Sequence, residues 1–344
     1  MTIREAISQA IDGASLTAAE AEQVMDGIMA GEATDVQIAG LLVALRIKRE
    51  TVDEIAGFAR AMLRNSVSVA RNAPICVDVC GTGGDARGTF NISTTVAFVA
   101  AGAGLSVAKH GNRSVSSRCG SADVLEALGV RLDLAPDDVG RCIDEIGIGF
   151  LYAPTLHPAM KYAIGPRCEL AVRTVFNLLG PLTNPARAEV QLVGVYDPAL
   201  TELMAEVLRS LGCRSAFVVH GGGGLDELST LGANRVSQLF DGQVESFDLD
   251  PVSLGLPLAR LCDLEGGDAA ENARILRAVL AGKTGPKRDI VLLNAAAILV
   301  AAGGAADLQR GLALAAETID SGAAHQSLDA LIAMTQGVEN LDGS

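Results

Sequence analysis

The sequence predicts an α/β protein in which a small N-terminal helical domain is joined to a large α/β domain with a mainly parallel, partly antiparallel central sheet. Three observations carry the prediction. The first seventy residues hold helix-capping signals, short β-rich runs alternate with helical segments from Ile75 onward, and two late β-rich runs meet at Asp241-Gly242. Strands that alternate with helices are typical of a parallel sheet, and an Asp-Gly turn is typical of a hairpin.

Capping boxes mark the helices of the N-terminal domain. Thr17, Thr34 and Thr51 are each followed three residues later by Glu or Gln, and each box precedes a periodic apolar stretch. After Thr34 the sequence IAGLLVALRIK (38–48) is apolar on nearly all sides. A helix without a polar face is expected to be buried, either in a bundle or in an interface with a partner.

The α/β domain is predicted from the alternating runs. A segment that interrupts them, 157–185, has two Gly-Pro steps and is expected to return to the helical domain and line a cleft. We therefore predict a helical domain of residues 1–70, joined by part of 157–187, and an α/β domain of residues 71–344. The expected strands are 75–79, 105–109, 147–152, 189–196, 215–220, 234–240 and 242–249, and the expected helices are 94–104, 121–129, 136–147, 199–212 and Ala-rich helix within 268–331.

Composition excludes several classes of function. The 344 residues carry a formal net charge of −14 and only 3% aromatic residues, so binding to nucleic acid is not expected. No apolar run has membrane-spanning length, and the N-terminus lacks the apolar core of a signal peptide. The seven cysteines form no CxxC pair. Without an export signal they are expected to be reduced thiols, which places the protein in the cytoplasm.

A glycine turn follows the first predicted strand. The sequence GTGGD (81–85) lies between this strand and the helical run after NIST (91–94), an arrangement typical of a phosphate cradle. It is neither a Walker loop nor GxGxxG, and a tight turn without ligand would use glycines too. The window 86–122 contains basic residues but no Asp or Glu. Asp85 would be unfavourable beside a bare phosphate, so we expect a ligand that also carries hydroxyls or a metal ion.

Two further motifs follow predicted strands. KHGNR (109–113) runs into SVSS (114–117) and offers cations and hydroxyl donors at a strand's carboxyl end, where α/β proteins bind ligands. HGGGGLDELS (220–229) places Asp226 and Glu227 on a glycine-rich loop. Adjacent carboxylates suit Mg²⁺, which binds one or two carboxylates together with water and substrate phosphates. An Asp-Glu pair is also ordinary at a helix start.

Together these motifs resemble the anthranilate phosphoribosyltransferase family. The resemblance rests on GTGGD (81–85), NIST (91–94), KHGNR (109–113), GSADVLEALG (120–129), HPAM (157–160), RTVFNLLGPLTNP (173–185) and HGxxGLDE (220–227), in the expected order through most of the chain. GTGGD alone is shared with pyrimidine nucleoside phosphorylases. The resemblance implies a homodimer, Mg²⁺ with two ions per active site, and the substrates phosphoribosyl pyrophosphate and anthranilate.

Site residues are carried over by position. Lys109, Asp85 and His110 are the expected catalytic residues. The metal is expected on Ser93, Asp226 and Glu227, and anthranilate on Gly81, Asn112, His157 and Arg167. Phosphoribosyl pyrophosphate is expected on Gly81, Gly84, Asp85, Thr89, Asn91, Ile92, Ser93, Thr94, Lys109, His110, Gly111, Asn112, Arg113, Ser114, Val115, Ser116, Ser117 and Ser121.

The implied reaction joins the amine of anthranilate to C1 of the ribose as pyrophosphate leaves. Catalysis would consist of positioning and charge stabilisation by Mg²⁺, Lys109 and backbone N–H groups, while the group that takes the amine proton stays open. Two positions depart from the family pattern, where Cys168 and Ala171 replace Arg and Gly. The variable positions of HGxxGLDE are both glycine.

Two other functions remain as alternatives. A pyrimidine nucleoside phosphorylase would bind free phosphate and a nucleoside, but the NLLGPLTNP segment and KHGNR fit the transferase better. A catalytically silent relative that binds nucleic acid is disfavoured by the net charge and by the intact Asp226-Glu227 pair.

Overall fold

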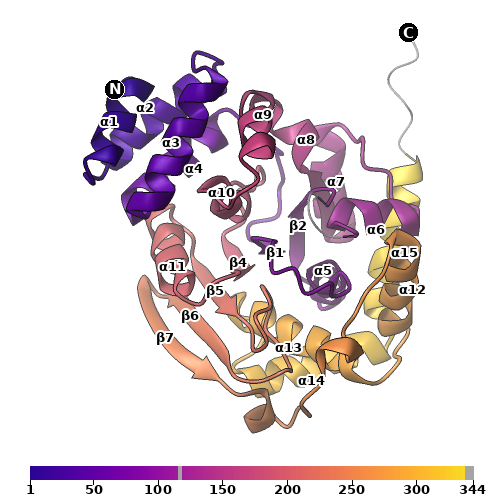
Figure 1. Cartoon of the computed structure of the whole chain (residues 1–344). Coiled ribbons are helices and arrows are strands. Elements are labelled where there is room, and N and C mark those ends of the chain that lie inside the picture. Colours follow the sequence, from indigo (N-terminus) through magenta and orange to yellow (C-terminus); the bar gives the residue numbers. More distant parts are fainter. Residues whose placement is uncertain (115–117, 338–344) are drawn as a thin grey trace.

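The computed structural model describes residues 1–114 and 118–337. Three predicted substrate-binding residues, Val115, Ser116 and Ser117, lie outside the described residues. Figure 1 shows the N-terminal helices to one side of a sheet that is surrounded by helices. The predicted class, a small helical domain and a large α/β domain, is confirmed.

Helix-capping chemistry sets the N-terminal helices. Thr17, Thr34 and Thr51 each accept from the N3 backbone N–H, and the N3 side chain accepts from the Thr N–H in return, as predicted. Thr2 and Glu5 form a further box that was not predicted. The helices are α1 (Ile3–Ile11), α2 (Ala18–Met29), α3 (Asp35–Lys48) and α4 (Val52–Arg64).

Seven strands of the described residues form one sheet in the order β3-β2-β1-β4-β5-β6-β7. The first five strands pair in parallel, and β6 and β7 add the predicted antiparallel hairpin. The chain builds outward from β1 to β2 and β3, then returns to the other side of β1 with β4. The strands are β1 (Cys76–Gly81), β2 (Ser106–Gly111), β3 (Ile148–Tyr152), β4 (Val190–Gly194), β5 (Ser215–His220), β6 (Asn234–Phe240) and β7 (Gln243–Leu249).

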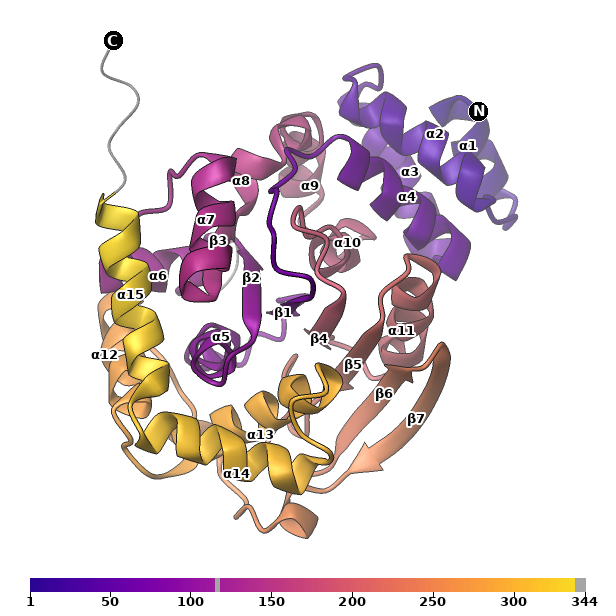
Figure 2. The ribbon, with the colours of Figure 1, turned by 180° about the vertical axis from the view of Figure 1, so that it is seen from behind.

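Helices cover both faces of this sheet (Figure 2). The first of them starts at Ile92, two residues earlier than predicted, and the Ala-rich end of the chain divides into separate helices. No helix in the two described ranges is long and apolar enough to cross a membrane. The α-helices are α5 (Ile92–Gly102), α6 (Ser121–Leu128), α7 (Pro136–Ile146), α8 (Ala153–Leu156), α9 (Lys161–Leu170), α10 (Phe176–Leu182), α11 (Leu200–Ser210), α12 (Ala269–Leu280), α13 (Pro286–Ala301), α14 (Leu308–Asp320) and α15 (Ala323–Gly337), and the 3₁₀ turns are η1 (Pro158–Met160), η2 (Pro251–Leu254) and η3 (Leu261–Asp263).

The helical bundle shares its core with one face of the sheet. Residues of α1 to α4, α9 and α10 pack in one apolar cluster with α11 and with Val193 and Val218 of the sheet. Within it α9 lies on α2 and α3, and α10 lies on α4. The segment that interrupts the alternation therefore packs between bundle and sheet, so its side chains are held on the bundle side of the strand ends. The domain boundaries themselves stay a prediction.

Candidate active site

The crevice expected for a ligand lies where the strand order reverses. β1 is flanked by β2 and β4. From β1 the chain adds β2 and β3 on one side, and it then adds β4 and β5 on the other side. In open parallel sheets, ligands bind at the carboxyl ends of the strands at such a switch point. Gly81 is the last residue of β1, and Gly194 is the last residue of β4. The glycine turn thus begins at the centre of the carboxyl edge.

Loop 221–229 packs directly onto these two strand ends. A Cβ on Gly194 would lie 1.5 Å from the carbonyl oxygen of Asp226, and a Cβ on Gly81 would lie 2.3 Å from its Oδ2. Only glycine permits this approach. The Asp226 carboxylate accepts a hydrogen bond from the Gly83 N–H at 2.7 Å. The predicted metal loop and the predicted phosphate turn are therefore in direct contact.

The two acids of this loop have no ion-paired cation among the described residues to stabilise their ionised forms. Burial, followed by the repulsion of Asp85, raises the pKa of Asp226, and burial together with Asp226 raises the pKa of Glu227. Across residues 1–114 and 118–337, neither carboxylate forms an ion pair with Lys, Arg or His. Glu227 Oε1 accepts from the Ser93 N–H at 3.2 Å, so the three predicted metal residues lie together.

This donor set fits Mg²⁺ bound together with a phosphorylated substrate. The protein offers two carboxylates and the Ser93 hydroxyl, all oxygen donors. Among the residues described, no group of three or more His, Cys, Asp or Glu side chains could hold a metal ion by itself. Mg²⁺ commonly completes its coordination with water and substrate phosphates rather than with an all-protein cage. A cation bound here would favour the ionised carboxylates, which burial disfavours.

The start of α5 is fastened to distant parts of the chain. Asn91 is its N-cap residue but makes no side-chain capping bond. Its amide instead donates to the carbonyl of Cys119 at 3.2 Å and accepts from Asn272 of α12 at 2.9 Å. Thr94 is buried, and its hydroxyl has no partner among the described residues. The N–H groups and positive dipole end of α5 thus lie beside the acidic loop, next to Ser93 and Glu227.

β1 and β2 separate before they reach the carboxyl edge. Their register includes only Cys76 with Ser106 and Val77 with Val107. Beyond it, the buried Asp78 carboxylate accepts from the His110 N–H at 3.2 Å and from the Asn184 amide at 2.8 Å. A side chain thus replaces the backbone ladder between the strands. The Lys109 ammonium in turn lies 3.4 Å from the His110 carbonyl, so both residues are held near the strand end.

Two neutral histidines meet beside this strand end. The rings of His110 and His157 lie 5.1 Å apart, and both are buried. Burial, followed by His157 and Lys109, lowers the pKa of His110 to about 3, and burial lowers the pKa of His157 to about 4. His110 Nδ1 lies 3.3 Å from the Gly180 carbonyl. Within the described residues the Nε2 atoms of both rings lack partners, so each can serve a ligand.

Arg167 lies on α9 with its guanidinium over the ring of Phe176, 5.0 Å from the centroid. Burial lowers the pKa of this guanidinium. In the described part of the chain it forms no ion pair, not even with Glu169 two residues away. A half-buried cation without a carboxylate partner suits an anionic ligand.

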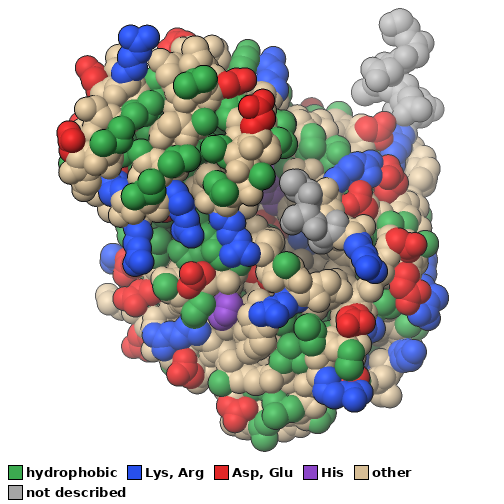
Figure 3. Space-filling view, in the orientation of Figure 1, with side chains coloured by type: hydrophobic (Ala, Val, Ile, Leu, Met, Phe, Trp, Pro, Cys, Tyr) green, Lys and Arg blue, Asp and Glu red, His purple; other side chains and the backbone are tan. Residues whose placement is uncertain are grey.

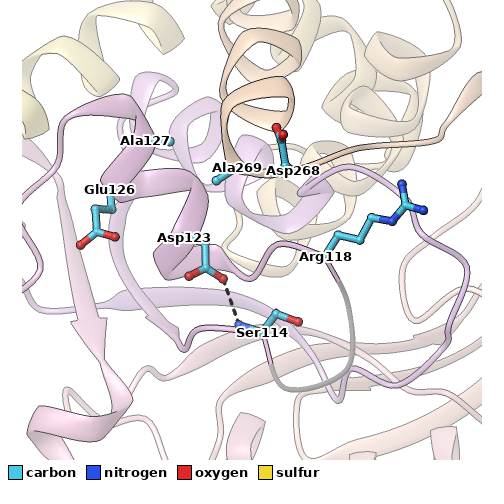
Figure 4. A pocket seen from close by; sticks show the side chains of 7 residues that line it. All are labelled: Ser114, Arg118, Asp123, Glu126, Ala127, Asp268 and Ala269. Carbon is cyan, nitrogen blue, oxygen red and sulfur yellow. Dashed lines mark hydrogen bonds between the residues drawn. The ribbon is translucent and has the colours of Figure 1, made fainter.

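Arg113 is turned toward α6. Its guanidinium binds the carboxylate of Glu126 through two hydrogen bonds of 2.8 and 2.9 Å and that of Asp123 at 3.0 Å. A hollow of about 570 Å³ lies on this side, and Figure 4 shows Asp123, Ser114 and Asp268 around it. Among the described residues, three acidic side chains line this hollow against a single arginine, Arg118, so its lining disfavours a phosphate. Arg113 could bind a phosphate, as predicted, only if its ion pairs with Glu126 and Asp123 open.

The remaining predicted residues lie around the same strand ends. Gly111 ends β2 and Asn112 follows it, and the Ser121 hydroxyl of α6 donates to the Asn112 carbonyl at 3.3 Å. Thr89 bridges to Glu265, and Ile92 is buried at the start of α5. Figure 3 shows the surface hollowed between the helical and α/β domains, with Lys and Arg side chains along the edge of the helical domain.

Four side chains that shape the site were not predicted: Asp78, Asn184, Asn272 and Arg173. Asp78 had one sequence signal, because it is an acid within the apolar run ICVDV. Asn184 and Arg173 lie in a motif that the resemblance included, but their residue type alone does not indicate a role. Asn272 contacts Asn91 across 181 positions of the chain, so no local pattern could indicate it.

Comparison with known proteins first defines the class. The family model described as "Glycosyl transferase family, helical bundle domain" matches residues 4–66, and that described as "Glycosyl transferase family, a/b domain" matches residues 73–325. The chain thus combines the helical bundle domain and the a/b domain of the glycosyl transferase family.

Individual relatives narrow this class. The chain is 59% identical to the anthranilate phosphoribosyltransferase of Moorella thermoacetica, over 97% of this chain and 98% of that protein. It is 54% identical to the enzyme of the same name from Desulfosudis oleivorans, over 96% and 98%. The chain belongs to the anthranilate phosphoribosyltransferase family.

Solved structures agree in fold. The crystal structure of anthranilate phosphoribosyltransferase from Thermus thermophilus matches with a TM-score of 0.92 and 47% identity, over 96% of this chain and 99% of that one. The enzyme from Saccharomyces cerevisiae in complex with PRPP and Mg matches with a TM-score of 0.89 and 29% identity, over 98% of both chains. These names support the transferase expectation over the phosphorylase and nucleic-acid-binding alternatives.

The lowered pKa of His110 predicts a loss of stability in mild acid. Below the ordinary pKa of 6.5 the unfolded chain binds a proton at this histidine, whereas the folded protein does not until about pH 3. The free energy of unfolding therefore falls as the pH drops below about 6.5, by about 2 kcal/mol at about pH 5 from this group alone. The loss is expected to be smaller in His110→Asn.

Urea denaturation at several pH values measures this difference, with His325→Asn on α15 as a control. Equal pH slopes for the wild type and His110→Asn would contradict the buried, neutral imidazole.

Proposed function

We propose that this protein transfers the phosphoribosyl group of 5-phosphoribosyl 1-pyrophosphate to the amine of anthranilate, giving N-(5-phosphoribosyl)anthranilate and pyrophosphate in tryptophan biosynthesis. One observation carries the proposal in the structure. An acidic loop seated on the glycine turn lies at the same carboxyl edge as the neutral histidine pair. A metal-assisted diphosphate site and a site for an aromatic acid would therefore share one crevice.

The donor substrate is proposed to occupy the switch point. The Asp85 N–H of the glycine turn has no partner among the described residues and is available to an anion, and Lys109 supplies a cation near the end of β2. Asp85 lies close enough to Asp226 to raise the pKa of the Asp226 carboxyl. An acid beside these groups suits a ligand that carries ribose hydroxyls and a metal ion as well as phosphates. We propose the donor site on the residues predicted from the sequence, with Arg113 engaged only after it leaves Glu126.

The acceptor is proposed to lie between α9 and the end of β2. Arg167 offers two parallel donors to the anthranilate carboxylate. Asn112 and Gly81 border the ribose side, and His157 lies against His110. The neutral rings would tolerate a flat aromatic ligand without repelling its amine.

The chemistry follows from these placements. The C1–O bond to pyrophosphate breaks as positive charge builds on the ribose ring, and the amine nitrogen then forms the new bond to C1. Lys109 and the turn N–H groups stabilise the leaving pyrophosphate. The amine becomes strongly acidic only after the C1–N bond forms, so a weak base suffices. The unpartnered Nε2 of His110 is neutral at pH 7 and can accept this proton.

Mg²⁺ is proposed on Ser93, Asp226 and Glu227, with two ions per active site. When bound, it supplies charge neutralisation for the pyrophosphate. The raised pKa values of both acids support a cation at this point. The protein's own contribution is to hold Asp226 against the glycine turn and Glu227 against the start of α5 before substrate arrives.

A homodimer through the helical domain is proposed from an apolar face that the single chain leaves open. Val36 and Ile47 of α3 are 82% and 79% exposed, Val43 lies between them on the same helix face, and Ile164 of the adjacent α9 is 52% exposed. Leu41 and Leu45 are buried in the chain's own bundle. These two residues therefore belong to the core of the bundle, and the proposed partner would bind the opposite face of α3.

The cytoplasm is proposed as the location. All seven cysteines are free thiols in the structure, as expected of a reducing compartment.

The proposed function predicts that anthranilate fluorescence is lost only when phosphoribosyl pyrophosphate and Mg²⁺ are both present. Asp226→Ala/Glu227→Ala is expected to lower turnover by at least about 100-fold and to raise the Mg²⁺ requirement, because the substituted loop no longer offers carboxylates. Circular dichroism checks that the fold survives. Near wild-type activity of the double variant at limiting Mg²⁺ would refute the metal site, and thymidine phosphorolysis by the wild type would refute the function.

Arg167→Ala is expected to raise the KM for anthranilate by about 10- to 100-fold, the effect of losing a charge-assisted hydrogen bond. The KM for phosphoribosyl pyrophosphate should move little. Arg167→Lys should recover only part of the loss, since an ammonium cannot form two parallel hydrogen bonds. Steady-state kinetics with each substrate varied in turn decides this, and equal losses for both substrates with a lower Tm would make Arg167 structural.

The dimer proposal predicts that Val36→Glu/Ile47→Glu shifts the protein from dimer to monomer at micromolar concentration. The charges would have to be buried in the interface without partners. Light scattering after size exclusion measures the mass. Phe240→Glu, at the exposed tip of the β6–β7 hairpin, is the matched control and should stay dimeric. A wild type that is monomeric throughout would contradict the proposal.

A further inference from the structure

A cation from the segment between α9 and α10 contacts the glycine turn. Ala171 ends α9 in the left-handed conformation, with φ of 50°, and redirects the chain toward the strand ends. Two residues later, the Arg173 guanidinium donates a hydrogen bond to the carbonyl of Gly84. A Cβ on Gly84 would lie 3.5 Å from Arg173 Nε, so the side chain packs against the turn.

Tyr196 gives this side chain its orientation. The ring lies under the guanidinium, 4.2 Å from its carbon to the ring centroid, and follows the end of β4 at Gly194. Stacking of a planar guanidinium on an aromatic face fixes its plane and leaves its edge free to donate. Arg173 is therefore held between a strand end of the sheet and the carbonyl that it binds.

The charge of Arg173 is not neutralised by the protein. Among residues 1–114 and 118–337 it forms no ion pair with Asp or Glu, although the whole chain has a net charge of −14. The residue is exposed to solvent. Four of its five N–H donors form no hydrogen bond with the described residues. An unpaired guanidinium beside an anion-binding turn is available to the anion.

The contact also sets the direction of a peptide group. The carbonyl of Gly84 and the N–H of Asp85 belong to one trans peptide, so they point in opposite directions. When Arg173 holds the carbonyl, the Asp85 N–H points away from Arg173. No hydrogen bond joins that N–H to another described residue. On the other side of the turn, Asp226 holds the Gly83 N–H at 2.7 Å. The turn is thus fixed at two successive residues by side chains from two different segments.

We propose that Arg173 is a positioning residue for the diphosphate donor: it fixes the Gly84–Asp85 peptide so that its N–H faces the pyrophosphate, and it adds a positive charge to that side of the crevice. The proposal rests on the proposed function of the glycine turn. It links the two substrates, because Arg173 lies six residues after the proposed anthranilate residue Arg167. The segment that would recognise the acceptor therefore also shapes the donor turn.

Arg173→Met tests the proposal, because Met keeps the length and the apolar stem but removes every donor. The KM for phosphoribosyl pyrophosphate and its Kd with Mg²⁺, measured by calorimetry without anthranilate, should both rise by about 10- to 100-fold. The KM for anthranilate and the Tm should stay unchanged, since the side chain is exposed. Arg173→Lys should recover part of the loss, and Tyr196→Leu should cause a smaller loss of the same kind.

Arg214→Met is the matched control, because Arg214 is also exposed and unpaired in the described chain but lies before β5, at the opposite end of the strands. It should behave as the wild type. Unchanged donor binding in Arg173→Met, while Asp226→Ala/Glu227→Ala loses it, would overturn this inference and leave the proposed function intact. A lower Tm with equal losses for both substrates would make Arg173 merely structural. A wild type that does not bind phosphoribosyl pyrophosphate would instead overturn the function itself.

Discussion

The close packing of Asp226 on Gly81 and Gly194 is the constraint on which the site depends. The two glycines end neighbouring strands at the point where the strand order reverses. Their missing side chains let an acidic loop approach until its backbone touches both strands and its carboxylate holds the Gly83 N–H. The buried negative charge this creates is costly by itself. A cation and a diphosphate would balance this charge. The folded protein therefore accepts a loss of stability in return for a site whose groups are positioned before the ligands bind.

The shared core extends this constraint to the helical domain. Because α9 and α10 pack in one apolar cluster with the bundle and with the sheet face, the bundle holds the segment between them at a fixed distance from the strand ends. Arg167 and Arg173 both come from this part of the chain. The helical domain can therefore affect the chemistry without supplying a residue to the diphosphate site, and any motion between the domains would move both arginines together.

The sequence was sufficient to predict the strands, the glycine turn and the acidic loop, because the signals for these features are local. Glycines at a strand end, paired acids and Thr capping boxes lie within a few positions of each other. The contacts that orient the site are not local. Asn184 reaches Asp78 across 106 positions, and Arg173 reaches Gly84 across 89. Arg113 shows the opposite limit, because its residue type indicated a phosphate ligand, whereas Glu126, 13 positions away, holds it as an ion pair.

Gly194→Ala tests the seating of the acidic loop most directly, because the new Cβ would lie 1.5 Å from the Asp226 carbonyl oxygen and no catalytic atom is removed. Gly27→Ala in α2, where a Cβ would meet nothing closer than 3.6 Å, is the control. Calorimetric titration with phosphoribosyl pyrophosphate and Mg²⁺ should show at least about tenfold weaker binding for Gly194→Ala, the effect of losing one oriented charged contact, with a folded circular dichroism spectrum. Binding equal to that of the wild type would contradict the account.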